Sequence, residues 1–135
     1  MNDDVKTYLR QKVATLPNSP GVYQFIDSKG AIIYVGKAKS LKKRVSSYFV
    51  ESQGHSAKVR IMVGKIVDIR HHVVDTEQDA LFLENSLIKE LQPRYNILLK
   101  DDKGYPYIRV NASLLLSAFL MILHIMKNST LLPAT

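Results

Sequence analysis

Apolar residues recur along this chain with two different periods, which predict helices and strands. Spacings of three and four residues, typical of a helix with one buried face, occur in residues 3–14, 41–49, 57–63 and 76–91. Shorter runs rich in β-branched and aromatic residues, typical of strands, occupy residues 21–26, 31–36, 66–74 and 105–110. Residues 101–104, Asp-Asp-Lys-Gly, have the composition of a turn.

The first two runs flank the polar residues 27–30 and predict a β-hairpin. If Asp27 and Gly30 close the turn, Tyr23 lies opposite Tyr34, and directly opposed side chains share a face. A bulge at Gly30 would shift this register by one residue. From these residues alone, two tyrosines that only pack and two that face a ligand are equally consistent with the pattern.

Glycines and polar residues near the hairpin indicate a place where a backbone segment or a ligand comes close to it. Gly21 precedes the first tyrosine and Gly36 follows the second, and a glycine beside a strand often marks a close contact with a backbone or ligand. Ser40 then has the chemistry of a helix N-cap. Arg44 and Tyr48 are four residues apart on the helix that follows, so they form a polar pair at the edge of its apolar stripe.

The longest predicted helix carries a carboxylate among apolar residues. It begins at the capping signal of Thr76 and ends before Pro93. Its buried stripe is expected to comprise Ala80, Leu81, Leu83, Leu87, Ile88 and Leu91. Glu84 lies near the centre of this stripe, where a carboxylate is costly unless it is paired, hydrogen-bonded or bound to a cation. Two interpretations stay open: a structural ion pair with Arg or Lys, and a ligand for Mg²⁺ or Mn²⁺.

Positive charge is concentrated in one stretch. Between Lys37 and Lys65, eight basic residues stand against Glu51 alone, so this stretch accounts for the whole formal net charge of +7. Such a patch is typical of a protein that binds a polyanion such as nucleic acid, and a solvated basic face is the alternative. The candidate DNA-binding residues are Lys39, Lys42, Lys43, Lys58 and Arg60.

Composition excludes several classes of site. The 135 residues contain no cysteine, which rules out disulfides, zinc–thiolate sites and thiol catalysis and fits a cytoplasmic protein. The acidic start lacks the order of a secretory signal. His71 and His72 point to opposite faces of any strand, so we expect them to be ordinary strand residues and not a shared metal site.

Five blocks of residues stand in order along the chain. They are Leu16-Pro17-x-x-Pro20-Gly21-Val22-Tyr23, Tyr34-Val35-Gly36-Lys37-Ala38-Lys39-Ser40-Leu41, Arg44-Val45-Ser46-Ser47-Tyr48-Phe49, Ala80-Leu81-x-Leu83-Glu84-x-x-Leu87-Ile88-Lys89 and Pro93-Arg94-Tyr95-Asn96-Ile97. Together they resemble the GIY-YIG nuclease family and, within it, the UvrC branch. The resemblance implies an α+β fold, a small three-stranded antiparallel sheet flanked by helices, with the active site on one sheet face.

The resemblance also implies a role for each matching residue. The residues with implied catalytic roles are Tyr23, Tyr34, Lys37, Arg44, Tyr48 and Asn96. Glu84 matches the metal-binding glutamate, with Mg²⁺ or Mn²⁺ as cofactor, and Gly21 and Gly36 match structural glycines. Lys37 and Tyr48 match positions specific to the UvrC branch, and Asn96 is expected to orient a tyrosine or the backbone.

A reaction scheme follows from these roles. Hydrolysis of a phosphodiester needs an activated water, stabilisation of the developing negative charge and help for the departing 3′-oxygen. A cation on Glu84 would supply the last two as a Lewis acid, and Arg44 suits a non-bridging phosphate oxygen. Lys37 would lower the pKa of a nearby phenol, so that Tyr23 or Tyr34 serves as general base; which of them does so stays open.

The implied function is that of a metal-dependent endonuclease that cuts damaged duplex DNA on the 3′ side of a lesion. The implied partners are damaged duplex DNA and UvrB, acting with UvrA, although the UvrB-binding segment of the family is not expected in this sequence. No membrane partner is expected. Two alternatives remain: a non-catalytic fragment that binds DNA or a partner, and a stand-alone GIY-YIG nuclease acting on another DNA structure.

The match ends near residue 110. We therefore expect an endonuclease domain at 1–110 and an atypical apolar tail at 111–135. Residues 114–126 are apolar and interrupted by His124, and they fall short of the ~20 residues that span a bilayer; a buried helix, an interfacial segment and a weak tail anchor are the options. Because proteins of the UvrC branch are much longer and carry a UvrB-binding segment, the expected origin is a truncated or frame-shifted gene.

Overall fold

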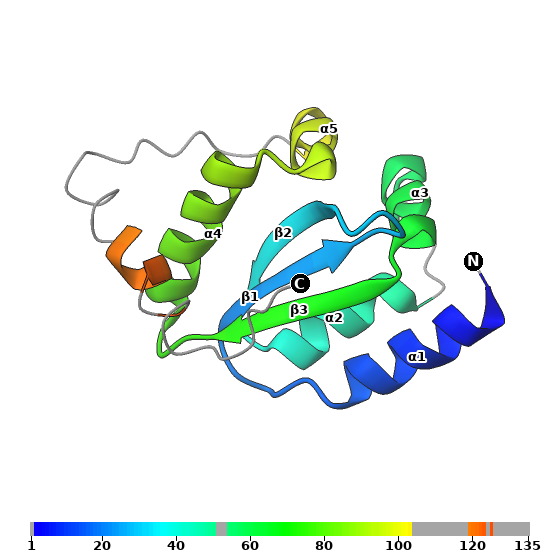
Figure 1. Ribbon diagram of the computed structural model, residues 1–135, viewed down its shortest axis with the longest axis horizontal. Helices are drawn as coiled ribbons and strands as arrows, with labels where there is room; N and C mark the ends of the chain where they lie inside the picture. The colour runs from blue at the N-terminus through cyan, green and yellow to red at the C-terminus, as the bar shows by residue number, and fades with distance from the viewer. Residues whose placement is uncertain (1, 51–53, 104–118, 124, 126–135) are drawn as a thin grey trace.

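The computed structural model describes residues 2–50, 54–103, 119–123 and 125, with no side-chain description for 101–103. Helices surround one small sheet that is formed by the described strands (Figure 1). The elements are α1 (Asp3–Ala14), β1 (Gly21–Ile26), β2 (Ile32–Ala38), α2 (Leu41–Phe49), α3 (Ala57–Lys65), β3 (Asp68–Val73), α4 (Glu77–Leu91) and α5 (Arg94–Lys103).

The sheet is antiparallel, with the strand order β2-β1-β3. β1 is the central strand, and all six of its residues are buried. β2 is an edge strand, so one row of its backbone groups faces away from the sheet. The predicted fold class and the predicted hairpin are confirmed.

The predicted hairpin register is wrong. The turn closes between Asp27 and Ala31, whose carbonyl accepts the Asp27 N–H at 3.0 Å, and the register shifts again between Phe25 and Ile26 because Ile33 is an extra residue in β2. Tyr34 therefore pairs with Phe25.

Tyr23 pairs with Gly36 instead of Tyr34. The two tyrosines still share one face, because a displacement by two residues preserves the alternation of the strand. They lie diagonally, with ring centroids 6.2 Å apart. Gly30 takes the left-handed conformation that its turn requires, at φ 82°.

Capping residues place the helices as predicted. The side chains of Ser40 and Thr76 accept the backbone N–H of Lys43 and Asp79, at 3.4 Å and 3.1 Å. α4 ends at Leu91, and its C-cap residue Gln92 adopts a left-handed conformation with φ 46°. These hydrogen bonds fix the start of α2 next to the end of β2 and the whole length of α4.

Two expectations near the end of α4 are wrong. Residues 101–103 continue α5 and form no turn. Leu91, expected in the buried stripe, is 40% exposed, because it lies in the last turn of α4, beyond the packed centre of the helix. The strand predicted at 105–110 lies outside the described residues.

The helices cover the sheet on both faces, and each face has its own apolar core. The larger core holds Tyr23, Phe25 and Tyr34 with residues of α1, α2, α3 and α5. The smaller core joins Val22 and Val35 to Ala80 and Leu83 of α4. The face between β2 and α4 is therefore separate from the face that carries the tyrosines.

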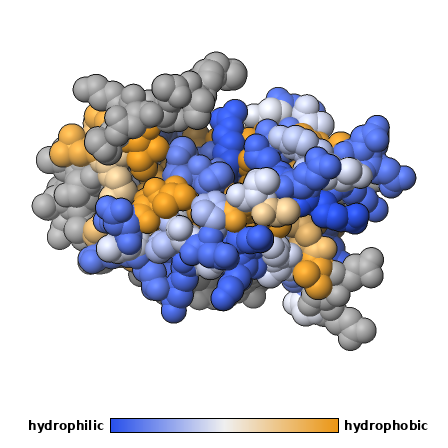
Figure 2. Space-filling model, turned by 90° about the horizontal axis from the view of Figure 1, so that it is seen from below, coloured by the Kyte–Doolittle hydropathy of each residue, from blue (hydrophilic) through white to orange (hydrophobic). Residues whose placement is uncertain are grey.

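Residues 119–123 and 125 of the apolar tail are helical, and Ile122 is buried in the smaller core. Phe119, Leu120 and Leu123 of the same segment are exposed, so the described part of the tail is only partly packed. Figure 2 shows a mostly hydrophilic surface, with hydrophobic residues gathered towards the left end, where α4 and residues 119–123 lie in Figure 1. No helix among the described residues has the length and apolar character needed to cross a membrane.

Candidate active site at the free edge of β2

Two polar side chains form hydrogen bonds with the outward-facing backbone N–H and carbonyl groups of β2. The side chain of Asn96 accepts the Val35 N–H and donates to the Val35 carbonyl, each at 2.8 Å. Glu84 Oε2 accepts the Lys37 N–H at 3.0 Å. Buried backbone groups need hydrogen-bond partners. Asn96 and Glu84 supply them at the outer edge of β2, where no further strand pairs among the described residues.

The tyrosines lie on the other side of this edge, beneath α2. The hydroxyl of Tyr23 is hydrogen-bonded to that of Tyr48 at 2.7 Å, and Tyr34 lies beside both rings. All three side chains are at most 5% exposed. A Cβ at Gly36 would overlap the Tyr23 ring and hydroxyl, so the glycine is required by the ring that packs across it.

These groups meet in one cavity of about 560 Å³, which we call the edge cavity. Of the residues predicted for the site, it is lined by Tyr23, Tyr34, Gly36, Lys37, Arg44 and Glu84. Tyr48 reaches it only through the hydroxyl of Tyr23, and Asn96 does not line it. The predicted catalytic and metal-binding residues thus come together, but around an edge of the sheet, with the tyrosines on one face and Glu84 on the other.

Glu84 is 7% exposed and lies at the wall of the edge cavity. Burial raises the pKa of its carboxyl above the ordinary value of 4.5, while the Lys37 charge, the Lys37 backbone N–H and the Arg44 charge each lower it. No salt bridge to Glu84 is found among the described residues, so they do not support a structural ion pair, which was one of the two interpretations of this carboxylate. The other carboxylate oxygen of Glu84, Oε1, is the atom that would coordinate a cation.

Burial, and next the Tyr48 phenol, raise the pKa of Tyr23 well above its ordinary value near 10, while the Arg44 guanidinium opposes the shift. The expectation that Lys37 lowers a phenol pKa is not met for Tyr23. Lys37 alternates with Gly36 along β2, so its side chain lies on the α4 side and acts on Glu84. Arg44 is the cation next to the phenols, with its guanidinium carbon 5.3 Å from the centroid of the Tyr48 ring.

The predicted DNA-binding residues divide into two groups. Lys39 and Lys43 line the edge cavity, and Lys42 lies next to Lys43 on α2. Lys58 and Arg60 lie on α3, where they donate to the carbonyls of Leu98 and His55.

Three residues that line the edge cavity were not among the predicted site residues: Ala38, Ser40 and Ser47. Ser47 lines the edge cavity together with Lys43 and Arg44, and its hydroxyl donates to the Arg44 carbonyl. The spacing of these residues by three and four positions on α2 was the available signal.

Residues 19–97 match the family described as the UvrC-like GIY-YIG domain. The chain belongs to this family. It is 62% identical over 103 residues to the UvrABC system protein C of Bacteroides thetaiotaomicron and 61% identical over 103 residues to that of Flavobacterium johnsoniae. Each match covers 76% of this chain but 17% of the relative, so the chain spans about a sixth of the length of these relatives.

A solved structure agrees with the fold. It is the GIY-YIG N-terminal endonuclease domain of UvrC from Thermotoga maritima bound to its catalytic divalent cation, magnesium. The TM-score is 0.59 at 35% identity, with 71% of this chain and 99% of that chain covered. The protein is thus a member of a nuclease family whose solved domain carries a catalytic divalent cation.

Proposed function

We propose that this chain hydrolyses a phosphodiester bond of DNA in the edge cavity, with one divalent cation held by Glu84. The observation that carries the proposal is the meeting of a buried carboxylate, an arginine and hydroxyl groups in a single cavity. These groups suit phosphodiester cleavage, because a carboxylate can hold a Lewis-acid cation, an arginine can stabilise the developing negative charge and a hydroxyl can orient water. By kinship with UvrABC system proteins C, the incision is the one on the 3′ side of a lesion.

The residues of the cavity fit Mg²⁺ or Mn²⁺. Within the described residues no group of three or more His, Cys, Asp or Glu side chains lies together, so Glu84 would be a single protein ligand. Mg²⁺ suits such a site because it keeps several waters and binds through one or two carboxylates plus phosphate oxygens. When bound, the cation would act as a Lewis acid for the phosphate and the departing oxygen.

Arg44 is proposed to bind a non-bridging oxygen of the scissile phosphate. Its guanidinium presents a planar set of donors that matches phosphate oxygens, and the side chain is at the cavity wall beside Tyr23. Lys37 lies near Glu84 and would add a second positive charge on the side of the carboxylate. The phosphate is thereby held between the α2 and α4 sides of the cavity.

Tyr23 is proposed to act as a neutral hydroxyl. Because its pKa is raised, a standing tyrosinate is disfavoured at neutral pH, and the pair with Tyr48 offers a path along which a proton moves between two phenols. Tyr34 lines the same cavity and is the second candidate to orient the attacking water. Asn96 positions β2 through Val35 and stays outside the chemistry.

The decisive variant is Glu84→Gln. It should abolish nicking of DNA in Mg²⁺ and also lower Mn²⁺ affinity, measured by electron paramagnetic resonance, while the circular dichroism spectrum stays unchanged. Glu90→Gln, at an exposed position of the same helix, is the matched control and should retain both properties. Nicking by Glu84→Gln at the wild-type rate would refute the metal assignment.

The partners are tested with a damaged duplex labelled at one end. We propose that cutting 3′ to the lesion requires UvrA and UvrB, so the product of defined length should form only in their presence. Cutting of the same duplex without them would favour a stand-alone nuclease.

A further inference from the structure

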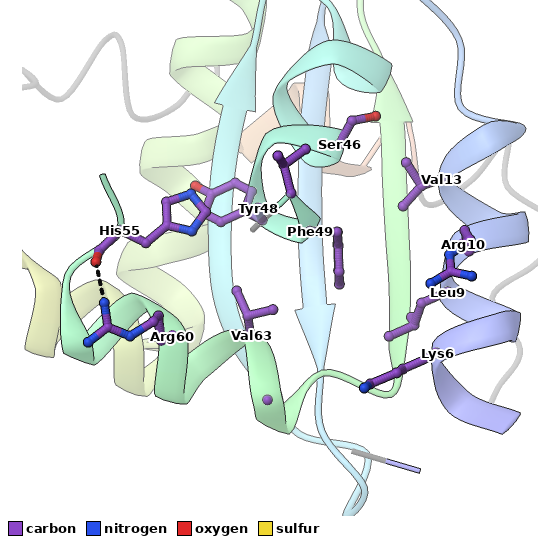
Figure 3. Close-up of a pocket in the computed structure, with 12 residues that line it drawn as sticks. Lys6, Leu9, Arg10, Val13, Ser46, Tyr48, Phe49, His55, Arg60 and Val63 are labelled. Carbon is purple, nitrogen blue, oxygen red and sulfur yellow. Dashed lines mark hydrogen bonds between the residues drawn. The ribbon is translucent and has the colours of Figure 1, made fainter. Parts of the chain in front are cut away.

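A second cavity, of about 550 Å³, lies between α1, α2 and α3, and we call it the apolar cavity. Its floor is formed by Leu9, Val13, Phe49 and Val63. In Figure 3, Phe49 of α2 lies between the side chains of α1 on one side and Val63 of α3 on the other. The volume falls in the range of ~300–1,000 Å³ typical of ligand sites, and none of these residues belongs to the edge cavity.

Cationic groups stand at both ends of this floor. Lys6 and Arg10 lie at the α1 end, and Arg60 lies at the opposite end, where it donates to the His55 carbonyl (Figure 3). No described residue that lines the cavity is acidic. The salt bridges found among the described residues, Lys12–Asp68 and Lys39–Glu77, do not involve Lys6, Arg10 or Arg60.

The residues that line the apolar cavity favour a peptide over a nucleotide base as the bound molecule. A nucleotide base buried here would bring ring nitrogens and carbonyls that need hydrogen-bond partners, whereas the floor offers mainly aliphatic and aromatic carbon. An amphipathic peptide satisfies both parts of the site, since its apolar side chains fill the floor and its acidic side chains face the cations.

We propose that the apolar cavity is the docking site of an acidic amphipathic segment of a protein partner. Tyr48 connects the two cavities. Its side chain lines the apolar cavity, and its hydroxyl is hydrogen-bonded to that of Tyr23, which lines the edge cavity. A docked segment therefore contacts Tyr48, the outer member of the phenol pair, and the side chains of Tyr48 and Tyr23 separate the partner from the edge cavity.

The test uses a fluorescein-labelled amphipathic peptide of fifteen residues, with Leu on one helical face and Glu flanking it, and fluorescence anisotropy as the readout. The blocking variant is Gly64→Trp, because Gly64 lines the cavity and an added Cβ there meets no atom within 4 Å. Its matched control is Gly64→Ala. We expect at least about tenfold weaker binding for the tryptophan variant and a change below about twofold for the alanine variant.

Charge is tested separately with the double variant Lys6→Glu/Arg10→Glu. It should lose at least about tenfold in affinity for the Glu peptide and gain affinity for a peptide in which Lys replaces Glu. A peptide with Ser in place of Leu should not bind. Equal binding of the Glu peptide by the wild type, Gly64→Trp and the charge variant would overturn the proposal.

Two further outcomes would also overturn it. One is a single-stranded oligonucleotide that binds in place of the peptide and is blocked by Gly64→Trp. The other is self-association of the chain that Gly64→Trp abolishes, which would make a second copy the occupant. Glu84→Gln should bind the Glu peptide normally, so failure of the docking proposal is distinguishable from failure of the nuclease proposal.

Discussion

At the scale of single residues, the close contact between Gly36 and Tyr23 links the hairpin to the chemistry. An alanine at position 36 would force the Tyr23 ring and hydroxyl to move and thereby break the hydrogen bond to Tyr48. We expect Gly36→Ala to lower the nicking rate at least about tenfold and the free energy of unfolding by about 1–3 kcal/mol. Steady-state nicking and urea unfolding measure the two effects.

The control for this variant is Gly64→Ala on α3, where the added methyl has open space. It should raise the free energy of unfolding by about 0.5–1 kcal/mol, because alanine is the better helix former. An active Gly36→Ala protein of wild-type stability would show that the ring is free to relocate.

The raised pKa of Tyr23 predicts a dependence of stability on pH. A phenol whose pKa is higher in the folded than in the unfolded chain contributes stability fully below the unfolded value of about 10. That contribution is lost as the pH rises through the folded pKa. Above about pH 10, the free energy of unfolding of the wild type should therefore fall more steeply than that of Tyr23→Phe, measured by urea unfolding at each pH. Parallel curves for the two proteins would contradict the burial of this hydroxyl.

At the scale of elements, Asn96 replaces the missing neighbour of the edge strand β2. Asn96→Leu would leave the N–H and carbonyl of Val35 without their partners, and we expect a loss of about 2–4 kcal/mol in the free energy of unfolding. Asn85→Leu is the matched control, since the side-chain nitrogen of Asn85 is buried without a hydrogen-bond partner among the described residues. This control should be neutral or stabilising in the same denaturation experiment.

The elements themselves could be predicted from local patterns, whereas their exact pairing could not. Caps at Ser40 and Thr76 involve residues three positions apart, so the sequence carries them directly. The register of β1 against β2 depends on the extra residue Ile33, which packs in the same core as its neighbour Tyr34. Nothing in a run of β-branched residues distinguishes a bulged from a regular strand.

The sequence predicted most of the residues of the candidate site but not how they are arranged in space. Glu84 stood out because one carboxylate interrupts an apolar stripe, and it is buried at the cavity wall. That Lys37 acts on Glu84 and Arg44 on Tyr23 depends on which face of β2 each side chain takes. Such an assignment requires the three-dimensional arrangement of β2 between α2 and α4.

At the scale of the whole molecule, the excess of positive charge is divided between two surfaces. Lys39 and Lys43 belong to the edge cavity, and the salt bridge of Lys39 to Glu77, at 3.9 Å between exposed side chains, is too solvated to neutralise it. Arg60 belongs to the rim of the apolar cavity, and Lys58 lies on the same helix. The basic residues that form one cluster in the sequence are thus divided between two different surfaces of the structure.

This division predicts different effects on DNA binding. Each phosphate contact contributes about 0.9 to the slope of log affinity against log salt concentration, so Lys39→Gln/Lys43→Gln should weaken binding to duplex DNA and reduce that slope by about 2. Lys58→Gln/Arg60→Gln removes the same charge from α3 and should leave the slope unchanged. Filter binding over a range of potassium chloride concentrations, in Glu84→Gln to prevent cleavage, measures both. Equal reductions by the two double variants would mean that the DNA extends over α3, and the acidic peptide would then have to compete with DNA for Arg60.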